Sequence, residues 1–193
     1  MKKRILIAVT LSFSLIACAK KENTETQNTP NEEVIENLDS EATILDTETE
    51  AFSKITLRKE FDDLKGKKIS FQNILKQHHG RPIVIDVWAS WCPDCIKGFP
   101  ELKKLQTAYP EAAYVFLSLD RSKDKWLEAI EKYNLIGDHY YLEEPMKGEF
   151  GTSINLDWIP RYILTDTQGN IALKKAIVAN DSLLISKLDK LHP

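Results

Sequence analysis

The chain has 193 residues, of which 42% are hydrophobic and 28% charged, an ordinary composition for one globular domain with extensions. The formal net charge of −3 is unevenly spread, because residues 1–18 hold three basic residues, residues 19–50 hold ten acidic residues and two lysines, and residues 51–193 are close to neutral. No basic stretch interleaved with aromatic residues occurs, which argues against nucleic acid as a partner.

Residues 1–18 have the pattern of an export signal. Three basic residues follow Met1, and the apolar run 5–16 is too short to span a bilayer, which takes about 20 residues. The tetrad LIAC that ends at Cys18 resembles the lipobox of bacterial lipoproteins. That resemblance implies lipidation of Cys18 and a protein anchored in the bacterial cell envelope, facing the periplasm or the outside of the membrane. An ordinary signal peptide with an incidental cysteine is the alternative.

The following segment, residues 19–51, is rich in Glu, Thr and Asn and contains no aromatic residue. Low hydrophobicity combined with high charge predicts a disordered linker. Repulsion between its acidic residues would keep it extended and hold the domain away from the membrane. The globular domain is therefore expected to span residues 52–193.

The first part of that domain is predicted to contain a hairpin and a helix. A weak alternation at Lys54–Arg58 indicates a strand, and Gly66 supplies the turn before a second short strand. Ser70 then caps a short helix that continues to Gln77.

The most informative stretch is the run from Ile83 to Trp88 and the dithiol that follows it. The run is apolar and rich in β-branched residues, which is typical of a central strand buried on both faces. It contains one acidic residue, Asp86, whose burial is costly unless it has a partner or a function. Cys92 and Cys95 come next, with the spacing of one helical turn.

The rest of the chain alternates helices with strands. A helix follows the dithiol, contains Pro100 and ends near Tyr109. The later elements are expected to be a strand 113–119, a helix 123–133 with Trp126, Leu127 and Ile130 facing inward, a strand 139–142, a helix 146–152, strands 161–165 and 171–175, and a last helix capped by Asn180. This alternation predicts mixed α/β layers around one sheet.

The dithiol has the features of a redox site. At a helix N-terminus, unpaired N–H groups and the helix dipole lower the pKa of the Cys92 thiol, which makes it the expected nucleophile. Pro93 suits the first helical position because that position needs no N–H. Cys95, more buried, is the expected resolving thiol. Asp94 adds negative charge beside the thiolate, so Pro93 and Asp94 are the expected tuners of the redox potential.

Asp86 lies six residues before Cys92. Burial should raise its pKa, which makes it a candidate proton acceptor for Cys95 at neutral pH. A zinc site is disfavoured because no second cysteine pair exists. A purely structural disulfide is disfavoured because so short a loop gives little entropic stabilisation. We therefore expect no metal and no cofactor besides the redox-active Cys92–Cys95 disulfide.

These residues resemble the thioredoxin superfamily, and within it the TlpA/ResA-like membrane-anchored thiol–disulfide oxidoreductases. The match covers roughly residues 52–191, and its marks are the hairpin with Gly66, the block from Asp86 to Cys95, Pro100, Ser118-Leu119-Asp120, Ile159-Pro160 and the turn 166–169. The resemblance implies a three-layer α/β/α fold with a central mixed sheet, an N-terminal β-hairpin extension and an insertion before the cis-proline loop.

The resemblance also implies roles for residues around the dithiol. It implies a cis peptide bond at Ile159–Pro160, packed against the dithiol, with the Ile159 backbone pairing with a bound substrate strand. Trp91 would shield the site, and Asp86 matches the buried acid of the family. Trp91, Ile159 and Pro160 are therefore the expected substrate-binding residues.

Two departures from the family limit what the resemblance implies. Pro93-Asp94 is neither the Gly-Pro of thioredoxin nor a common TlpA dipeptide, which leaves the redox potential open. The Gly-Val-x-Gly-x-Pro-Glu loop of cytochrome-maturation members is absent, since residues 155–161 read NLDWIPR. Apocytochrome c is therefore one candidate substrate and not the default. A peroxiredoxin is disfavoured because its cysteine signature is absent at Cys92.

The predicted function is thiol–disulfide exchange that reduces disulfides of exported proteins. Electrons would come from a membrane thiol reductase. An oxidase or isomerase that uses the same dithiol is the first alternative. A redox-inert binding module with this fold is the second, and the intact cysteine pair together with Asp86 argues against it.

Overall fold

The structure of the protein is a computed structural model that describes residues 50–191. The predicted export signal, the lipidation at Cys18 and nearly all of the acidic linker lie outside the described residues. Glu50 already pairs with Ile171 through two backbone hydrogen bonds, two residues ahead of the predicted start of the domain. Every helix in the described range is too short or too polar to cross a bilayer.

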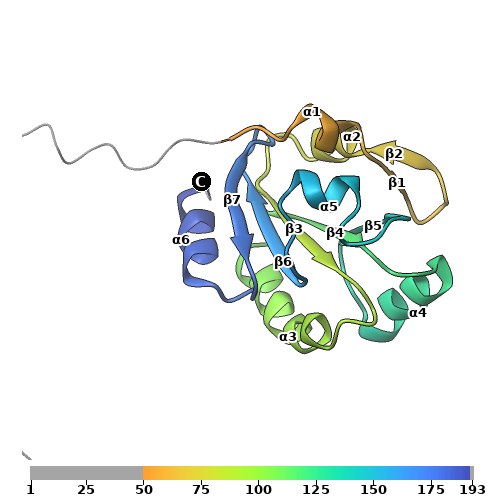
Figure 1. Cartoon of the computed structure of the whole chain (residues 1–193). Helices are drawn as coiled ribbons and strands as arrows, with labels where there is room; N and C mark the ends of the chain where they lie inside the picture. Colours follow the sequence, from red (N-terminus) through yellow and green to blue (C-terminus); the bar gives the residue numbers. More distant parts are fainter. Residues whose placement is uncertain (1–49, 192–193) are drawn as a thin grey trace, which may run out of the picture. The chain divides into compact units, whose positions relative to one another are not determined.

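Helices and strands alternate along this range, as Figure 1 shows. In chain order they are α1 (Lys54–Arg58), β1 (Glu60–Asp62), β2 (Lys68–Ser70), α2 (Phe71–Lys76), β3 (Ile83–Trp88), α3 (Pro93–Ala108), β4 (Ala113–Ser118), α4 (Lys123–Tyr133), β5 (Asp138–Tyr141), α5 (Glu149–Ser153), β6 (Arg161–Thr165), β7 (Ile171–Ala176) and α6 (Ser182–Leu191).

The described strands form one sheet in the order β2-β1-β5-β4-β3-β6-β7. The pairs β3–β4 and β4–β5 are parallel, and the remaining pairs are antiparallel. The sheet is therefore mixed, as the resemblance implies. All six residues of β3 are buried, which agrees with its continuous apolar sequence and its central place.

Helices cover both faces of the sheet (Figure 1). On one face, Phe71 of α2 packs edge-on against Phe150 of α5, with ring centroids 5.5 Å apart. On the other face, Phe99 of α3 contacts Tyr133 of α4 at 5.3 Å, and it also packs against Trp88 of β3. Helix α6 joins this second group, because the Tyr109 hydroxyl that follows α3 donates to Asp189. The predicted three-layer α/β/α fold is confirmed.

The N-terminal hairpin is confirmed, but its first strand lies elsewhere than predicted. Lys54–Arg58 is a helix and not a strand, because the Ser53 side chain caps it by accepting from the N–H of Thr56. The strand that pairs with β2 is instead Glu60–Asp62. Gly66 has a φ of 76°, in the left-handed region that a tight turn needs and that glycine adopts without strain.

Two details of the later helices also differ from the predictions. The carboxylate of Asp181, and not the side chain of Asn180, accepts from the N–H groups of Leu183 and Leu184 at the start of α6. Leu127 of α4 is exposed, whereas Trp126 is buried. The buried face of α4 is therefore narrower than the apolar pattern indicated.

Candidate functional site

The dithiol lies where β3 leads into α3. Cys92 is the N-cap of α3, with an extended backbone, and Pro93 occupies the first turn. A disulfide joins Cys92 to Cys95, whose Cα atoms are 5.3 Å apart. The backbone N–H of Cys95 points at the Cys92 sulfur from 3.2 Å. This N–H and the positive end of the helix dipole are placed to stabilise a thiolate at Cys92.

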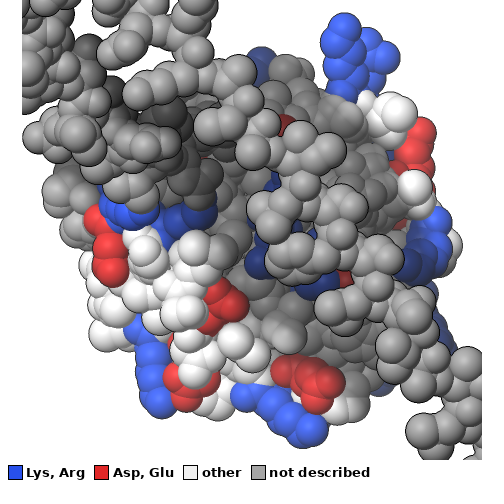
Figure 2. Space-filling model, turned by 60° about the vertical axis from the view of Figure 1, so that its left-hand side comes forward, with Lys and Arg blue, Asp and Glu red and all other residues white. Residues whose placement is uncertain are grey.

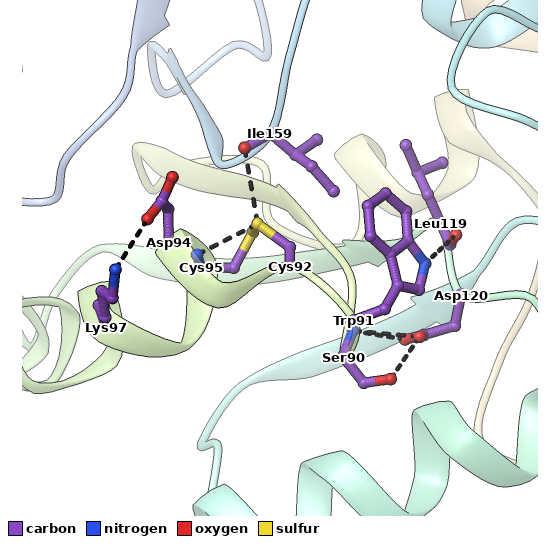
Figure 3. The surroundings of a disulfide bond; sticks show 9 residues. All are labelled: Ser90, Trp91, Cys92, Asp94, Cys95, Lys97, Leu119, Asp120 and Ile159. Carbon is purple, nitrogen blue, oxygen red and sulfur yellow. Dashed lines mark hydrogen bonds and ion pairs between the residues drawn. A yellow bond between two sulfur atoms is a disulfide. The ribbon is translucent and has the colours of Figure 1, made fainter.

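Both sulfurs are almost fully enclosed. Cys92 is 3% exposed and Cys95 is 1% exposed, so the expected difference in burial is small. Trp91, by contrast, is 42% exposed, and its indole N–H donates to the carbonyl of Leu119 at 3.4 Å. Figure 3 shows this indole beside the turn that carries Cys92. The enclosed Cys92 thus lies between the exposed Trp91 on one side and a loop on the other (Figure 3).

That other side is the loop before β6. The Ile159–Pro160 peptide bond is cis, as the resemblance implies. The carbonyl oxygen of Ile159 lies 3.5 Å from the Cys92 sulfur, although the two residues are 67 positions apart in the chain (Figure 3). Arg161 ties the loop to β6 by donating to the carboxylate of Asp157. The fold thus brings together Cys92, Ile159 and Pro160 from two distant segments.

A groove of about 630 Å³ adjoins this loop. Its walls include the exposed apolar side chains of Trp158, Ile177 and Val178, together with Pro160 and residues of α3. Figure 2 turns the β7 and α6 side of the domain forward, and basic and acidic side chains are interspersed over the part that it draws. The lining of this groove accordingly combines its apolar side chains with charges of both signs, from Asp94, Glu101, Asp157, Lys97 and Lys175.

Asp86 is buried at the middle of β3, with 2% of its surface exposed. Neither carboxylate oxygen has a hydrogen-bond partner within residues 50–191. Burial raises the pKa of Asp86 to about 8, because the charged form loses its hydration and gains nothing in return. A carboxyl group with such a pKa can exchange a proton near neutral pH, which is what a proton acceptor for Cys95 must do.

Asp94 lies on the outer side of α3. Its side chain is exposed and forms an ion pair of 3.4 Å with Lys97, which is also exposed (Figure 3). Exposed pairs of this kind are screened by solvent and contribute little free energy. Redox tuning by Pro93 and Asp94 stays a prediction.

Asp120 is an acidic residue of the site for which the sequence predicted no function. The carboxylate of Asp120 accepts from the backbone N–H of Ser90 at 3.0 Å and from the Ser90 hydroxyl at 2.6 Å (Figure 3). It also accepts from the Ser118 hydroxyl at 2.8 Å. It thereby fixes the turn just before Cys92. The carboxyl ends of parallel strands meet at one sheet edge. Because Asp120 follows the end of β4, which runs parallel to β3, the sequence could have predicted that it lies near the end of β3.

Metal binding has no support from side-chain positions in the described part of the chain. No group of three or more His, Cys, Asp and Glu residues between 50 and 191 is placed to hold a metal ion.

Two comparisons decide the family. A model of thioredoxin-like proteins matches residues 80–171. The solved structure of a candidate thiol–disulfide oxidoreductase from Bacteroides vulgatus is 30% identical and superposes with a TM-score of 0.57, covering 68% of this chain and 84% of that one. The chain belongs to the thioredoxin-like family. The dithiol at the start of α3 and the cis-proline loop beside it lie within the matched region.

Curated relatives of this thioredoxin-like chain carry related names. It is 32% identical over 103 residues to the thiol:disulfide interchange protein DsbE of Yersinia pestis, which covers 53% of this chain and 52% of that protein. It is 27% identical over 135 residues to the thiol–disulfide oxidoreductase ResA of Bacillus cereus, with coverage of 68% and 73%. The match thus spans about half the length of the Yersinia relative.

Proposed function

We propose that the protein is a thiol–disulfide oxidoreductase that reduces disulfide bonds in proteins through Cys92 and Cys95. The observation that carries the proposal is the disulfide at the N-terminus of α3, with its Cys92 sulfur 3.5 Å from the Ile159 carbonyl of the cis-proline loop. The names of the DsbE and ResA relatives support the same reaction class.

The first step uses Cys92 as the nucleophile. Its thiolate attacks one sulfur of a substrate disulfide, so that a Cys92–substrate bond forms and the substrate S–S bond breaks. The departing substrate sulfur leaves as a thiolate and takes a proton from water. Unpaired N–H groups at the start of α3 stabilise the attacking thiolate. Trp91, Ile159 and Pro160 hold the substrate strand beside the sulfur, and apolar residues of the groove receive its side chains.

The second step uses Cys95 and Asp86. The Cys95 thiol gives its proton to the Asp86 carboxylate, and the resulting Cys95 thiolate attacks the Cys92 sulfur. The Cys92–Cys95 disulfide forms, and the second substrate thiolate is released. Two electrons have then passed from the protein dithiol to the substrate. A separate thiol reductant restores the dithiol, and we propose a membrane thiol reductase for that role.

The cellular setting belongs to the same proposal. We propose that residues 1–18 direct export, that Cys18 carries the lipid, and that residues 19–51 form the linker to the domain. Substrates would then be disulfide-containing proteins of the cell envelope, with apocytochrome c as one candidate. Retention of the protein in the membrane fraction, and its loss from that fraction in Cys18→Ala, test this part.

Cysteine variants test the reaction itself. Cys92→Ser should abolish reduction of insulin disulfides by dithiothreitol-fed protein, because no nucleophile remains. Cys95→Ser should instead accumulate mixed disulfides through Cys92, visible by mass spectrometry, because the resolving thiol is missing. Full turnover by Cys92→Ser, or an absence of trapped adducts in Cys95→Ser, would refute these assignments.

The direction of electron flow is tested by the reduction potential of the Cys92–Cys95 couple, measured in glutathione buffers. A value near about −270 mV, as in thioredoxin, supports a reductant. A value near about −120 mV, as in a strong oxidant, would replace reduction by oxidation. If the Cys92–Cys95 disulfide cannot be reduced at all, the result would support a redox-inert binding module instead of an oxidoreductase.

A further inference from the structure

Arg121 is an exposed basic residue that contacts Trp91, the residue just before Cys92. Its guanidinium carbon lies over the Trp91 ring, 5.9 Å from the ring centroid. A cation within about 6 Å of a tryptophan ring is attracted to its face, and arginine makes such contacts more often than lysine. Arg121 belongs to the loop between β4 and α4, so the fold brings a positive charge to the side of the dithiol where Trp91 lies.

The same loop also holds the turn before the dithiol through hydrogen bonds. The indole N–H of Trp91 donates to the carbonyl of Leu119 at 3.4 Å (Figure 3). The carboxylate of Asp120 accepts from the N–H and the hydroxyl of Ser90. Three consecutive loop residues therefore contact this turn. Leu119 and Asp120 use their hydrogen-bonding groups to do so, whereas Arg121 uses its charge.

The N–H donors of Arg121 are not used within the described part of the chain. The guanidinium forms no hydrogen bond and no ion pair there, and its contact with Trp91 occupies none of its donors. The carboxylate of the neighbouring Asp120 is bound to Ser90 and Ser118 instead. A guanidinium carries five N–H groups in one plane, and a carboxylate can accept two of them at once. Arg121 therefore presents donors that match a carboxylate, beside the residue that precedes Cys92.

The two lysines that follow in the chain differ from Arg121, because acidic residues of the domain already pair with them. Lys123 pairs with the buried Asp62 at 2.9 Å, and Lys125 pairs with Glu128 at 2.7 Å. An incoming carboxylate would have to displace those partners, whereas Arg121 has no such partner among the described residues. Of these three basic residues, Arg121 is therefore the one best placed to bind an acidic group.

We propose that Arg121 is a specificity-determining residue that binds a substrate carboxylate, from an Asp or Glu close in sequence to the cysteine that Cys92 attacks. The inference rests on the proposed function and names the class of its substrates. A substrate strand held beside Cys92 passes the exposed Trp91, and Arg121 lies over that ring. An exposed ion pair contributes up to about 1 kcal/mol, which corresponds to about fivefold in rate.

The test compares short disulfide-bonded peptides that differ only in Glu, Gln or Lys placed just before or just after one cysteine. Reduced full-length protein is mixed with each peptide, and loss of the peptide disulfide is followed by chromatography after acid quenching. Each rate constant is divided by that of dithiothreitol with the same peptide, which removes the intrinsic effect of the charge on the disulfide. At one position or both, the Glu peptide should react about fivefold faster than the Gln peptide, and the Lys peptide more slowly than either.

Substitutions of exposed residues assign the preference to Arg121. Arg121→Gln should remove the preference for Glu, and Arg121→Lys should keep part of it, because lysine retains the charge without the planar donors. Lys125→Gln is the matched control, since it removes the same charge from a residue that Glu128 already pairs with, and the preference should remain. Salt at about 1 M should weaken the preference of the wild type, because the Debye length then falls to about 3 Å.

Two results would overturn the proposal. One is a wild type that reduces the Glu, Gln and Lys peptides at equal normalised rates. The other is an Arg121→Gln variant that slows every peptide by the same factor, which would mean that Arg121 only holds the Trp91 ring. Failure of the proposed function looks different, because peptide reduction would then survive in Cys92→Ser or be absent from the wild type for every peptide. The Arg121 proposal would fall with it.

Discussion

Asp86 lies in the strand that leads to the dithiol and Asp120 fixes the turn before Cys92; both acidic residues are buried, and their surroundings are opposite. Asp86 is 2% exposed and its oxygens have no hydrogen-bond partner among the described residues. Asp120 is 4% exposed and accepts from a backbone N–H and two hydroxyl groups. Burial alone therefore does not decide what a carboxyl group does. Hydrogen-bond donors hold Asp120 as a structural anchor, and their lack leaves Asp86 free to take up and release a proton.

The largest effect should come from removing the proton acceptor. In Asp86→Asn, insulin reduction near pH 7 should fall by about 100-fold, the lower end of what a general base contributes. The rise in rate through about pH 8 should also disappear, since that rise follows the titration of Asp86. The measurement is the pH–rate profile of wild type and variant. A variant that keeps the wild-type profile would make Asp86 a structural residue like Asp120.

The same substitution should have the opposite effect on stability. The Asp86 pKa is about 8 when folded and about 3.9 when unfolded, so above pH 4 the unfolded chain loses this proton first. The wild type therefore loses stability as pH rises from about 4 to 8, by at most about 1.4 kcal/mol for each pH unit. Asp86→Asn should be more stable than the wild type at pH 8 and equal to it at pH 4 in urea unfolding.

An intermediate effect is expected at the anchor. Asp120→Ala leaves the Ser90 N–H and the hydroxyls of Ser90 and Ser118 without their acceptor. The free energy of unfolding should drop by about 3 kcal/mol, measured by urea unfolding at pH 7. The midpoint of the pH–rate profile should stay where it is, because Asp120 does not exchange the Cys95 proton. A shifted midpoint would contradict the proposal that Asp86, and not Asp120, exchanges the proton of Cys95.

The smallest effect is expected from removing the Ser118 hydroxyl. This hydroxyl donates to the Asp120 carboxylate at 2.8 Å and accepts from the Asp120 backbone N–H at 3.0 Å, and Ser118→Ala leaves the two Ser90 donors in place. The unfolding free energy should fall by about 1 kcal/mol. Lys97→Ala is the control, since its exposed ion pair with Asp94 should contribute less than about 1 kcal/mol. Equal losses of unfolding free energy in Ser118→Ala and Lys97→Ala would show that the Ser118 hydroxyl stabilises the fold no more than an exposed ion pair does.

Predictions from the sequence succeeded where the signal is local. The capping of α2 by Ser70, the bounds of β3 and α4, and the end of α3 near Tyr109 all follow from residues adjacent in the chain. The predictions failed where the local sequence favoured two alternatives almost equally. In Lys54–Arg58, a weak alternation of apolar and polar residues favours a strand, whereas Ser53 is a good N-cap and favours a helix. The segment forms the helix. At α6, Asn180 and Asp181 both suit a cap, and only the backbone path shows that Asp181 is used.

By itself, the sequence determined the thioredoxin-like order of elements, the buried strand with Asp86, and Cys92 and Cys95 at the start of a helix. Only the tertiary structure decided which acid has partners. Asp120 reaches Ser90 because β4 ends beside β3. Asp86 lies between Phe116 of β4 and Tyr162 of β6, and neither forms a hydrogen bond with it. Hydrogen bonds depend on distances between atoms of separate segments, and spacing along one segment does not specify those distances.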